Sequence, residues 1–335
     1  MDLIHADESL VEIGYIKEID SFDAELSQET DAPIDKNTWA LTVSDAIWES
    51  DPIEIGHYVY IPDTEWGGQV EQIRHSTALK QITVSGVTWR GMLYRKIIEP
   101  GSGADYLTIT ATEANSAIST IVGTSLGTLF SVSAAASGIT ITSKSFRYTN
   151  MLTGIESMLA DYGGALQIAF SQATKTVTLS ARAIVDYSAT VDLSQDYGVD
   201  MVSTLGGYDR YNHIIALGAG ELTDRDIVHV YRNTDGTLTT VAPAWVGTAA
   251  DHVRVYDYNN PETIAKLQEG AEKLALELAP HNAVEMDPSV EGLTLLLGDV
   301  VGARDRLTGL SATASIVGRI LTMNTNGIKL ETRVG

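Results

Sequence analysis

The sequence predicts a β-rich α+β fold with a long helix near residues 261–279. Three observations lead to this prediction. Residues 1–98 alternate apolar and polar side chains in short runs that end at Gly, Pro, Asp or Asn, as half-buried strands do. Residues 99–195 add helical patterns, and residues 196–335 return to alternation around one strong helix. We therefore expect three domains: a β-rich unit, an inserted α+β module, and a second β-rich unit that carries the long helix.

Five or six short strands are expected in the first domain. Their runs are "EIGYIKEIDSFDAEL" (12–26), "TWALTVSDA" (38–46), "HYVYIP" (57–62), "GQVEQIRHS" (68–76) and "KQITVSGV" (80–87). In the second run, alternation places Trp39, Leu41 and Val43 on one face. Several short strands separated by turns predict a small barrel or a sandwich.

The middle module combines two helices with a hairpin. A helix is expected at about 112–122, where the Thr112 hydroxyl can accept hydrogen bonds from the first free amides. A second helix begins after Asn150 or Thr149 and ends at a Gly-Gly pair. Residues 165–184 then alternate on both sides of a short polar segment, which predicts a hairpin.

The third domain has strands on both sides of its helix. Alternating runs at 212–220, at 226–242 and in the tail from residue 293 predict these strands. Two tight hairpin turns are expected, at Asp235-Gly236 and Asn326-Gly327. The helix between them has Asn260 as its N-cap, Pro261 at its first position and Pro280 at its end.

Positive charge gathers in one stretch of this chain, "ITVSGVTWRGMLYRKIIEP" (82–100). A strand there runs into a short amphipathic segment that places Trp89 on the side opposite Arg90, Arg95 and Lys96. The stretch is either a binding site or a structural joint. In a joint, the cations neutralise acidic neighbours within or between subunits; otherwise they form a solvated face beside a turn.

The charge balance restricts the classes of partner. With 44 Asp and Glu against 22 Lys and Arg, the formal net charge is −22, which argues against sequence-specific DNA binding. The acidity serves either solubility or a surface to which DNA does not adhere, such as a conduit for DNA. No run of about 18 apolar residues is present, so no membrane anchoring is expected. The acidic N-terminus does not resemble a cleavable secretory signal.

Residue patterns for catalysis or metal binding are weak. The chain has no cysteine, which excludes disulfides, cysteine nucleophiles and thiolate metal sites. "GLSAT" (309–313) lacks the second glycine of a nucleophile elbow, and "GTSLGTLF" (123–130) lacks the lysine of a phosphate loop. No pair of histidines has HExxH or HxH spacing; the seven are His5, His57, His75, His213, His229, His252 and His281. We predict no catalytic, cofactor-binding or metal-binding residues, and no enzymatic activity.

One enzymatic alternative stays open, a carbohydrate-active enzyme. So many acidic residues always supply some pair of carboxylates, the chemistry that glycoside hydrolysis needs. Trp48 and Trp66 are expected in loops, exposed enough to contact sugars, whereas alternation places Trp39 and Trp89 in the core.

Two regions carry a distinctive order of motifs. The first joins a "G-x-Y-[IV]-x-I" strand to a "GG-x-[IV]-x-x-I" strand and then to a strand that ends in Ser-Gly before "II-x-P"; its residues are Gly56, Tyr58, Val59, Ile61, Gly67, Gly68, Val70, Ile73, Ser85 and Gly86. The second, at 295–323, carries Gly298, Asp299, Val301, Asp305, Gly309 and Ile316. Together they resemble the tail hub, or tail-associated (baseplate hub-like), proteins of long-tailed phages and prophages.

This resemblance implies a structural virion component, a tail (baseplate) hub at the tail tip. It implies two small β-barrels like those of the tail tube, the first in residues 1–98 and the second in 196–335, with the α+β module inserted between them. Three copies would form a ring of six barrels that connects the tail tube to the tip and lines the DNA passage. The implied partners are further copies in a homotrimer and the tail-tube, distal-tail and tape-measure proteins, assembled in the bacterial host cytoplasm.

The sequence departs from the family pattern in two respects. Val87-Thr88 stand where a Gly-Arg pair is expected. No fibre, lysozyme-like or peptidase-like extension follows the hub-like region, which puts a direct receptor-binding or wall-cutting role in doubt. The alternatives are another tail or injection-machine protein, such as a tube or distal-tail component, and the carbohydrate-active cell-wall enzyme.

Overall fold

The computed structural model describes residues 2–28, 36–50, 52–123, 125–189, 192–193, 201–204, 211–258, 263–279, 283–286, 294–305, 307–309 and 311–335. Its contacts divide the chain into a large unit and a small unit. The large unit comprises residues 1–201, 285–304 and 313–335, and the small unit comprises residues 202–284 and 305–312. The fold is rich in strands and has few helices, which confirms the predicted α+β, β-rich class.

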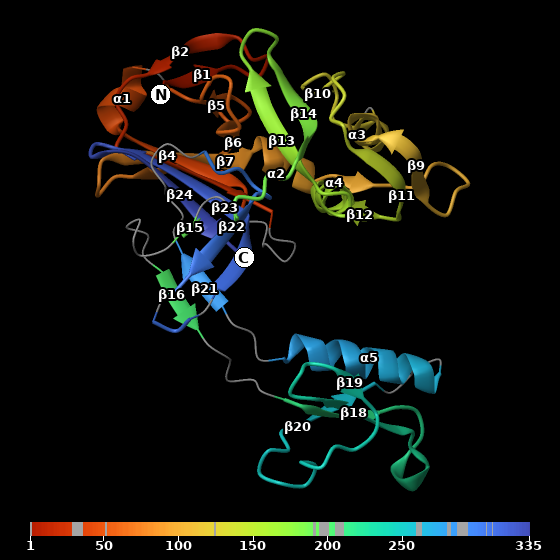
Figure 1. Ribbon diagram of the computed structural model, residues 1–335. Coiled ribbons are helices and arrows are strands. Elements are labelled where there is room, and N and C mark those ends of the chain that lie inside the picture. Colours follow the sequence, from red (N-terminus) through yellow and green to blue (C-terminus); the bar gives the residue numbers. More distant parts are fainter. Residues whose placement is uncertain are drawn as a thin grey trace. The chain divides into compact units, whose positions relative to one another are not determined.

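An eleven-stranded sheet dominates the large unit. Its order is β15 (Asp192–Leu193), β22 (Val300–Arg304), β23 (Ser311–Asn324), β3 (Ser21–Ser27), β4 (Thr38–Ser44), β7 (Gln81–Thr88), β6 (Gly67–Ser76), β5 (Tyr58–Tyr60), β1 (Leu3–Ala6) and β2 (Glu12–Ile16), with β24 (Gly327–Val334) also paired to β23. Strands from the two ends of the sequence therefore lie side by side, as the red and blue arrows of Figure 1 show.

Strands from the first and last predicted domains thus share one sheet. In the antiparallel pair β3–β23, Phe22 lies opposite Met323 and Ala24 lies opposite Leu321. A local sequence pattern cannot reveal this pairing, because the two strands are about 300 residues apart in the chain. The division into three consecutive domains and the arrangement as two barrels stay predictions.

The alternating runs form strands because each buries one face. Trp39, Leu41 and Val43 of β4 are buried as expected, and the intervening residues are partly exposed. At the crossing of β6 and β7 the backbones approach so closely that a Cβ on Gly68 would lie 1.8 Å from the Val87 carbonyl oxygen. Only glycine fits there, which gives the "GG" motif a structural reason. The short helix α1 (Asp45–Ser50) follows β4 and was not expected from the sequence.

The middle of the chain folds onto this sheet as further elements of the large unit (Figure 1). They are α2 (Trp89–Tyr94), β8 (Ile97–Ile98), β9 (Leu107–Glu113), α3 (Ala114–Val122), β10 (Phe130–Val132), β11 (Thr140–Phe146), β12 (Thr149–Asn150), α4 (Met151–Ala160), β13 (Gly164–Ser171) and β14 (Thr176–Ala183). β13 and β14 form the predicted hairpin. One hydrophobic core runs through both parts, from Ile4 and Tyr60 of the sheet past Trp89 to Ile118 and Phe170.

The helix caps confirm one expectation and correct another. Asn150 caps α4, since its side-chain oxygen accepts a hydrogen bond from the amide of Thr153. Thr112 does not cap α3, because it belongs to β9 and lies opposite Ile141 in the pair β9–β11. The cap is Glu113, whose carboxylate accepts hydrogen bonds from the next two free amides. A carboxylate at a helix N-terminus also interacts favourably with the helix dipole.

The small unit is a four-stranded sheet with one helix. The strand order is β19 (Leu238–Thr239), β18 (Ile227–Arg232), β17 (His213–Leu217) and β20 (Val253–Asp257); a 3-10 turn, η2 (Leu222–Asp224), precedes β18, and β16 (Met201–Thr204) pairs with β21 (Ala283–Met286). Helix α5 (Ile264–Glu277) confirms the predicted long helix, and its apolar face packs on β17 and β18. Thr263 caps it; the expected signals Asn260, Pro261 and Pro280 lie outside the described residues. No described helix has the length and apolar character that membrane crossing requires.

Candidate functional site: an acidic groove beside a buried ion-pair joint

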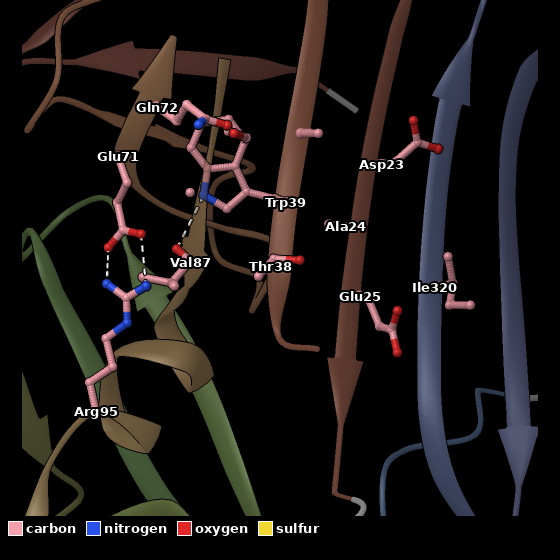
Figure 2. Close-up of a pocket in the computed structure, with 13 residues that line it drawn as sticks. Asp23, Ala24, Glu25, Thr38, Trp39, Glu71, Gln72, Val87, Arg95 and Ile320 are labelled. Atoms are coloured by element: carbon pink, nitrogen blue, oxygen red, sulfur yellow. Dashed lines mark hydrogen bonds and ion pairs between the residues drawn. The ribbon is translucent and has the colours of Figure 1, made fainter. Parts of the chain in front are cut away.

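A groove of about 610 Å³ lies on the face of the large sheet that points away from its apolar core. Strands β3, β4, β6, β7 and β23 contribute its walls (Figure 2). The lining residues are Asp23, Ala24, Glu25, Thr38, Trp39, Ala40, Glu71, Gln72, Ser85, Gly86, Val87, Arg95 and Ile320. Three carboxylates and one guanidinium among them make the groove acidic.

Strand alternation explains why this face is polar. Along β3 the buried Phe22, Ala24 and Leu26 alternate with Asp23 and Glu25, whose side chains stand in the groove (Figure 2). Pairing in register extends the polar face across the neighbouring strands as a row of small or polar residues: Asp23 lies opposite Ala40, Ala40 opposite Ser85, and Ser85 opposite Gln72. The row has no bulky apolar residue, and its one charged residue is Asp23; Glu25 beside it is paired with Arg333.

Arg95 sits at one side of the groove and is neutralised within the chain. Its guanidinium forms a two-pronged ion pair with the Glu71 carboxylate, in which Nη2 lies 2.8 Å from Oε2 (Figure 2). Both side chains are partly exposed, so the pair is screened by solvent. This pairing agrees with the interpretation of the basic stretch as a joint with acidic neighbours. Lys96 is exposed at the surface.

Arg90, from the same stretch, is fully buried. Its Nε donates to Glu65 Oε1 at 2.7 Å, its Nη1 donates to Glu156, and its Nη2 donates to the Leu166 carbonyl oxygen at 3.3 Å. These partners come from the β5–β6 loop, α4 and β13. Of the two interpretations left open for Arg90, the solvated face is therefore wrong, and neutralisation of acidic neighbours agrees with the structure. The guanidinium is a joint that links the sheet to the middle elements.

The buried charges shift one another's protonation. Burial raises the pKa of Glu156 to about 7, although the adjacent Arg90 opposes this shift. Burial by itself lowers the pKa of Arg90, but the carboxylates of Glu65 and Glu156 outweigh it, so the net shift is upward. Arg90 therefore stays charged, whereas Glu156 is the member of this cluster that titrates near neutrality.

Aromatic stacking surrounds the same joint. The Trp89 ring stacks on Phe170 of β13, with centroids 5.2 Å apart, and on Tyr58 of β5, with centroids 5.7 Å apart. Contacts of this kind fix the orientation of α2, because aromatic pairs add a geometric preference to their buried area. The basic stretch thus anchors the middle elements through one charged and one aromatic residue, consecutive in sequence.

A second joint involves the "GD" motif of the C-terminal region. Asp299 is 1% exposed; its Oδ1 accepts from Arg182 Nη1 at 2.7 Å and its Oδ2 accepts from the Leu296 amide at 2.9 Å. Gly298 has φ +88°, and a Cβ there would lie 2.8 Å from the Cβ of Ala165. Glycine fits this backbone and space, and the aspartate ties the tail to β14, so both motif residues have structural roles.

The tryptophans and the possible metal ligands of the described residues bear on the enzymatic and metal-binding alternatives. No group of three or more His, Asp or Glu among them is arranged to hold a metal ion. Trp39 and Trp89 are buried as expected. Trp66 was expected to be exposed for sugar contact, but it is buried at 5% exposure with the Arg319 guanidinium 5.5 Å from its ring centre. Trp48 lies in α1 rather than in a loop.

Sequence spacing gave no sign of two histidine pairs. His5 and His57 lie 2.9 Å apart through Nε2 and Nδ1, and His213 and His229 lie 2.8 Å apart through the same atom types. The partners are 52 and 16 residues apart in sequence, so the fold rather than a motif brings them together. His229 was expected to be satisfied or exposed, and its ring nitrogen is indeed bonded, to another histidine.

The comparisons with known proteins identify the fold. No protein-family model and no curated protein matches the sequence. Among solved structures, the 43 kDa tail protein of prophage MuSo2 from Shewanella oneidensis matches with a TM-score of 0.56 at 13% identity, covering 100% of this chain and 98% of its own. Prophage tail protein gp18 from Listeria monocytogenes EGD-e matches with a TM-score of 0.51 at 15% identity, covering 100% and 94%. A tail protein from Neisseria meningitidis MC58 matches with a TM-score of 0.50 at 12% identity, covering 99% and 95%.

The chain therefore has the fold of solved prophage tail proteins, along nearly its whole length. At 12 to 15% identity the likeness shows the fold alone. It confirms, at the level of the fold, the resemblance to phage tail-associated proteins that the two motif regions predicted.

Proposed function

We propose that this chain is a structural component of a phage or prophage tail, the hub at the tail tip. The observation that carries the proposal is the match in fold to three prophage tail proteins, each covered over 94% or more of its length. A shared fold does not define a function by itself. The residue evidence that supports a structural role is that the buried charges of Arg90 and Asp299 are paired within the chain and hold elements together.

In this role three copies form a ring, each copy contributes two tube-like barrels, and the ring connects the tail tube to the tip. The acidic groove with Asp23, Glu25 and Glu71 is the surface we assign to the DNA passage. DNA phosphates gain no ion pairs on such a face, so the duplex slides without adhering. The partners are the other two copies and the tail-tube, distal-tail and tape-measure proteins, and the site of action is the virion tail tip after assembly in the host cytoplasm.

Cryo-electron microscopy of the purified full chain, with native mass spectrometry of the same sample, tests the proposal. We expect a trimer with threefold symmetry and an acidic central opening lined by the groove. A dimer or tetramer, or a trimer whose groove faces outward, would contradict the hub assignment. A sixfold ring with one barrel per copy would favour a tube or distal-tail component.

The carbohydrate-active enzyme is the less favoured alternative. The burial of Trp66 at 5% exposure weakens it, because this side chain was one of the two expected to contact sugars. Incubation of the protein with bacterial cell walls and capsular polysaccharides is the direct check. We expect no release of sugar or peptide, and release that disappears on substitution of a single carboxylate would establish the enzyme.

A further inference from the structure

A second, smaller pocket of about 250 Å³ adjoins the acidic groove in the large unit. Strands β6 and β7, helix α2 with the two residues after it, and the segment from residue 125 into β10 supply its walls. The groove and this pocket share Glu71, Val87 and Arg95. We call it the α2 pocket; its lining residues are Gln69, Glu71, Val87, Met92, Arg95, Lys96, Ser125, Leu126, Leu129 and Phe130.

Half of the residues that line the α2 pocket are apolar. Val87 and Phe130 are buried, whereas Met92, Leu126 and Leu129 pack against the large core and are only partly buried. The pocket therefore has apolar surface that a further side chain can cover. Its volume lies below the range of about 300–1,000 Å³ that is typical of pockets for whole small-molecule ligands. The pocket suits one bulky side chain better than a cofactor.

The rim of the α2 pocket carries an excess of positive charge. Arg95 and Glu71 neutralise each other in the ion pair described above, which leaves the Lys96 ammonium. The Lys96 side chain is exposed, and none of the described residues forms an ion pair with it. Its backbone is anchored, because its amide donates to the Leu93 carbonyl oxygen at 3.1 Å and its carbonyl oxygen accepts from the Met151 amide at 2.8 Å. The rim thus offers one cation in a chain whose net charge is −22.

The two uncharged polar side chains of the lining already bond within the chain. Gln69 Nε2 donates to the Gly56 carbonyl oxygen at 3.2 Å, and Ser125 Oγ donates to the Val122 carbonyl oxygen at 2.6 Å. The Lys96 ammonium is therefore the group of the rim that a partner engages by charge. A carboxylate is attracted to this rim and a second cation is repelled. The chemistry that fits the whole pocket is a bulky apolar side chain with a carboxylate beside it.

We propose that the α2 pocket is a docking site for an acidic segment of a protein partner, in which a bulky apolar side chain fills the pocket and a neighbouring carboxylate pairs with Lys96. The basic stretch at 82–100 then serves as a joint through Arg90 and as a binding site through Lys96. The proposal stands on the shape and charges of the α2 pocket and does not depend on the tail assignment.

NMR of the methionine methyl groups in the full chain tests the proposal, because Met92 lines the pocket. The probe is the blocked tripeptide acetyl-Glu-Phe-Glu-amide, titrated at about 0.02 M salt, where exposed charges are weakly screened. We expect the Met92 signal to shift with saturation, while the signal of Met158, buried in α4, stays in place. Acetyl-Lys-Phe-Lys-amide should bind with a roughly fivefold higher Kd. Acetyl-Glu-Gly-Glu-amide, which lacks the apolar side chain, should leave the Met92 signal unchanged.

Two matched charge reversals separate docking at the rim from a general effect of charge. Lys96→Glu makes the rim negative, so the basic peptide should now bind more tightly than the acidic one. Lys175→Glu makes the same change in the turn between β13 and β14, outside the α2 pocket, and should keep the preference of the wild type. Both lysines are exposed, so neither change disturbs the core.

Three outcomes would overturn the proposal. The first is a Met92 signal that no peptide moves, and the second is equal binding of the acidic and basic peptides by the wild type. The third is a Lys96→Glu variant that still prefers the acidic peptide. Decanoate, an acyl chain with a carboxylate, is titrated in parallel. A Met92 signal that responds to decanoate and to neither peptide would assign the pocket to a lipid instead of a protein segment.

Discussion

At the scale of single residues, Arg90 joins the sheet to the middle elements through one buried guanidinium. Substitution by methionine keeps most of the volume but leaves Glu65 and Glu156 without their cation. Removing one partner of a buried ion pair costs roughly 3–5 kcal/mol, because the remaining charge is desolvated and unpaired. We expect Arg90→Met to lose that much free energy of unfolding near pH 8, measured by urea denaturation. Arg95→Met removes a partly exposed pair and should change it by less than about 1 kcal/mol; equal losses would contradict the joint.

Glu156 gives the same joint a defined pH dependence. Its pKa is raised from 4.5 to about 7 in the folded protein, so between these values the folded state holds a proton that the unfolded state releases. The resulting stabilisation is complete below the lower value and is lost as the pH rises through about 7. We expect Glu156→Gln to flatten this part of the stability profile, and to be relatively more stable, compared with the wild type, at pH 8 than at pH 5. A difference between variant and wild type that is the same at both pH values would show that the carboxylate stays charged in the folded protein over this range.

Residue-scale predictions from the sequence succeeded where a residue's role is local. The burial of Trp39 and the cap of Asn150 follow from alternation and from short-range hydrogen bonding. The burial of Arg90 does not, because its compensating carboxylates come from positions 25 and 66 residues away. The pairing of His213 with His229 could not be predicted for the same reason. Spacing rules detect ligands that lie on one helix or strand, whereas these two rings belong to different strands, β17 and β18.

At the scale of elements, the turn that carries the "GD" motif has a glycine that can be tested. Gly298→Ala adds a methyl group both to a left-handed backbone and to a space already filled by Ala165. We expect a loss of roughly 2–4 kcal/mol in free energy of unfolding, the sum of backbone strain and overpacking. Gly138→Ala isolates the backbone part, since Gly138 has φ +80° and nothing within 4 Å of the added atom. Gly138→Ala should lower the free energy of unfolding by about 1–2 kcal/mol. A loss equal to that of Gly298→Ala would show that contact with Ala165 contributes nothing at Gly298.

Element by element, the sequence predicted strands, hairpins and the long helix well. The β13–β14 hairpin and α5 follow their periodicity because each buries one face against a neighbour. The N-cap of α3 is Glu113 and not the expected Thr112, because the pairing of β9 with β11 includes Thr112 and continues to Glu113. Helix α1 has only 6 residues and no fully buried side chain, so it left no apolar stripe that a pattern could detect.

At the scale of the whole molecule, chain order does not give the sheet order. The three ranges expected as domains change composition at their boundaries, yet β23 pairs with β3, and the strongest helix belongs to the small unit, whose main segment is residues 202–284. The C-terminal strands β22, β23 and β24 follow the main segment of the small unit in the sequence, but they belong to the large sheet. One motif region precedes this return in the sequence and the other includes β23, and periodicity, which is a local signal, could not reveal that they share a sheet.

The charge of the molecule gives a prediction about assembly. In the proposed trimer each copy brings a formal net charge of −22, so the three copies repel one another over a distance set by the ionic strength. The Debye length falls from about 30 Å at 0.01 M salt to about 10 Å at 0.1 M, which removes most of this repulsion between exposed charges. We expect the trimer fraction in sedimentation equilibrium to rise as NaCl increases over that range. Reversing two groove charges, in Asp23→Lys with Glu25→Lys, should reduce this salt dependence more than the same two reversals at Glu269 and Glu277 of α5, if the groove lines the threefold opening. Trimers that dissociate as salt is added would instead mean that ion pairs between copies outweigh the repulsion of their net charge.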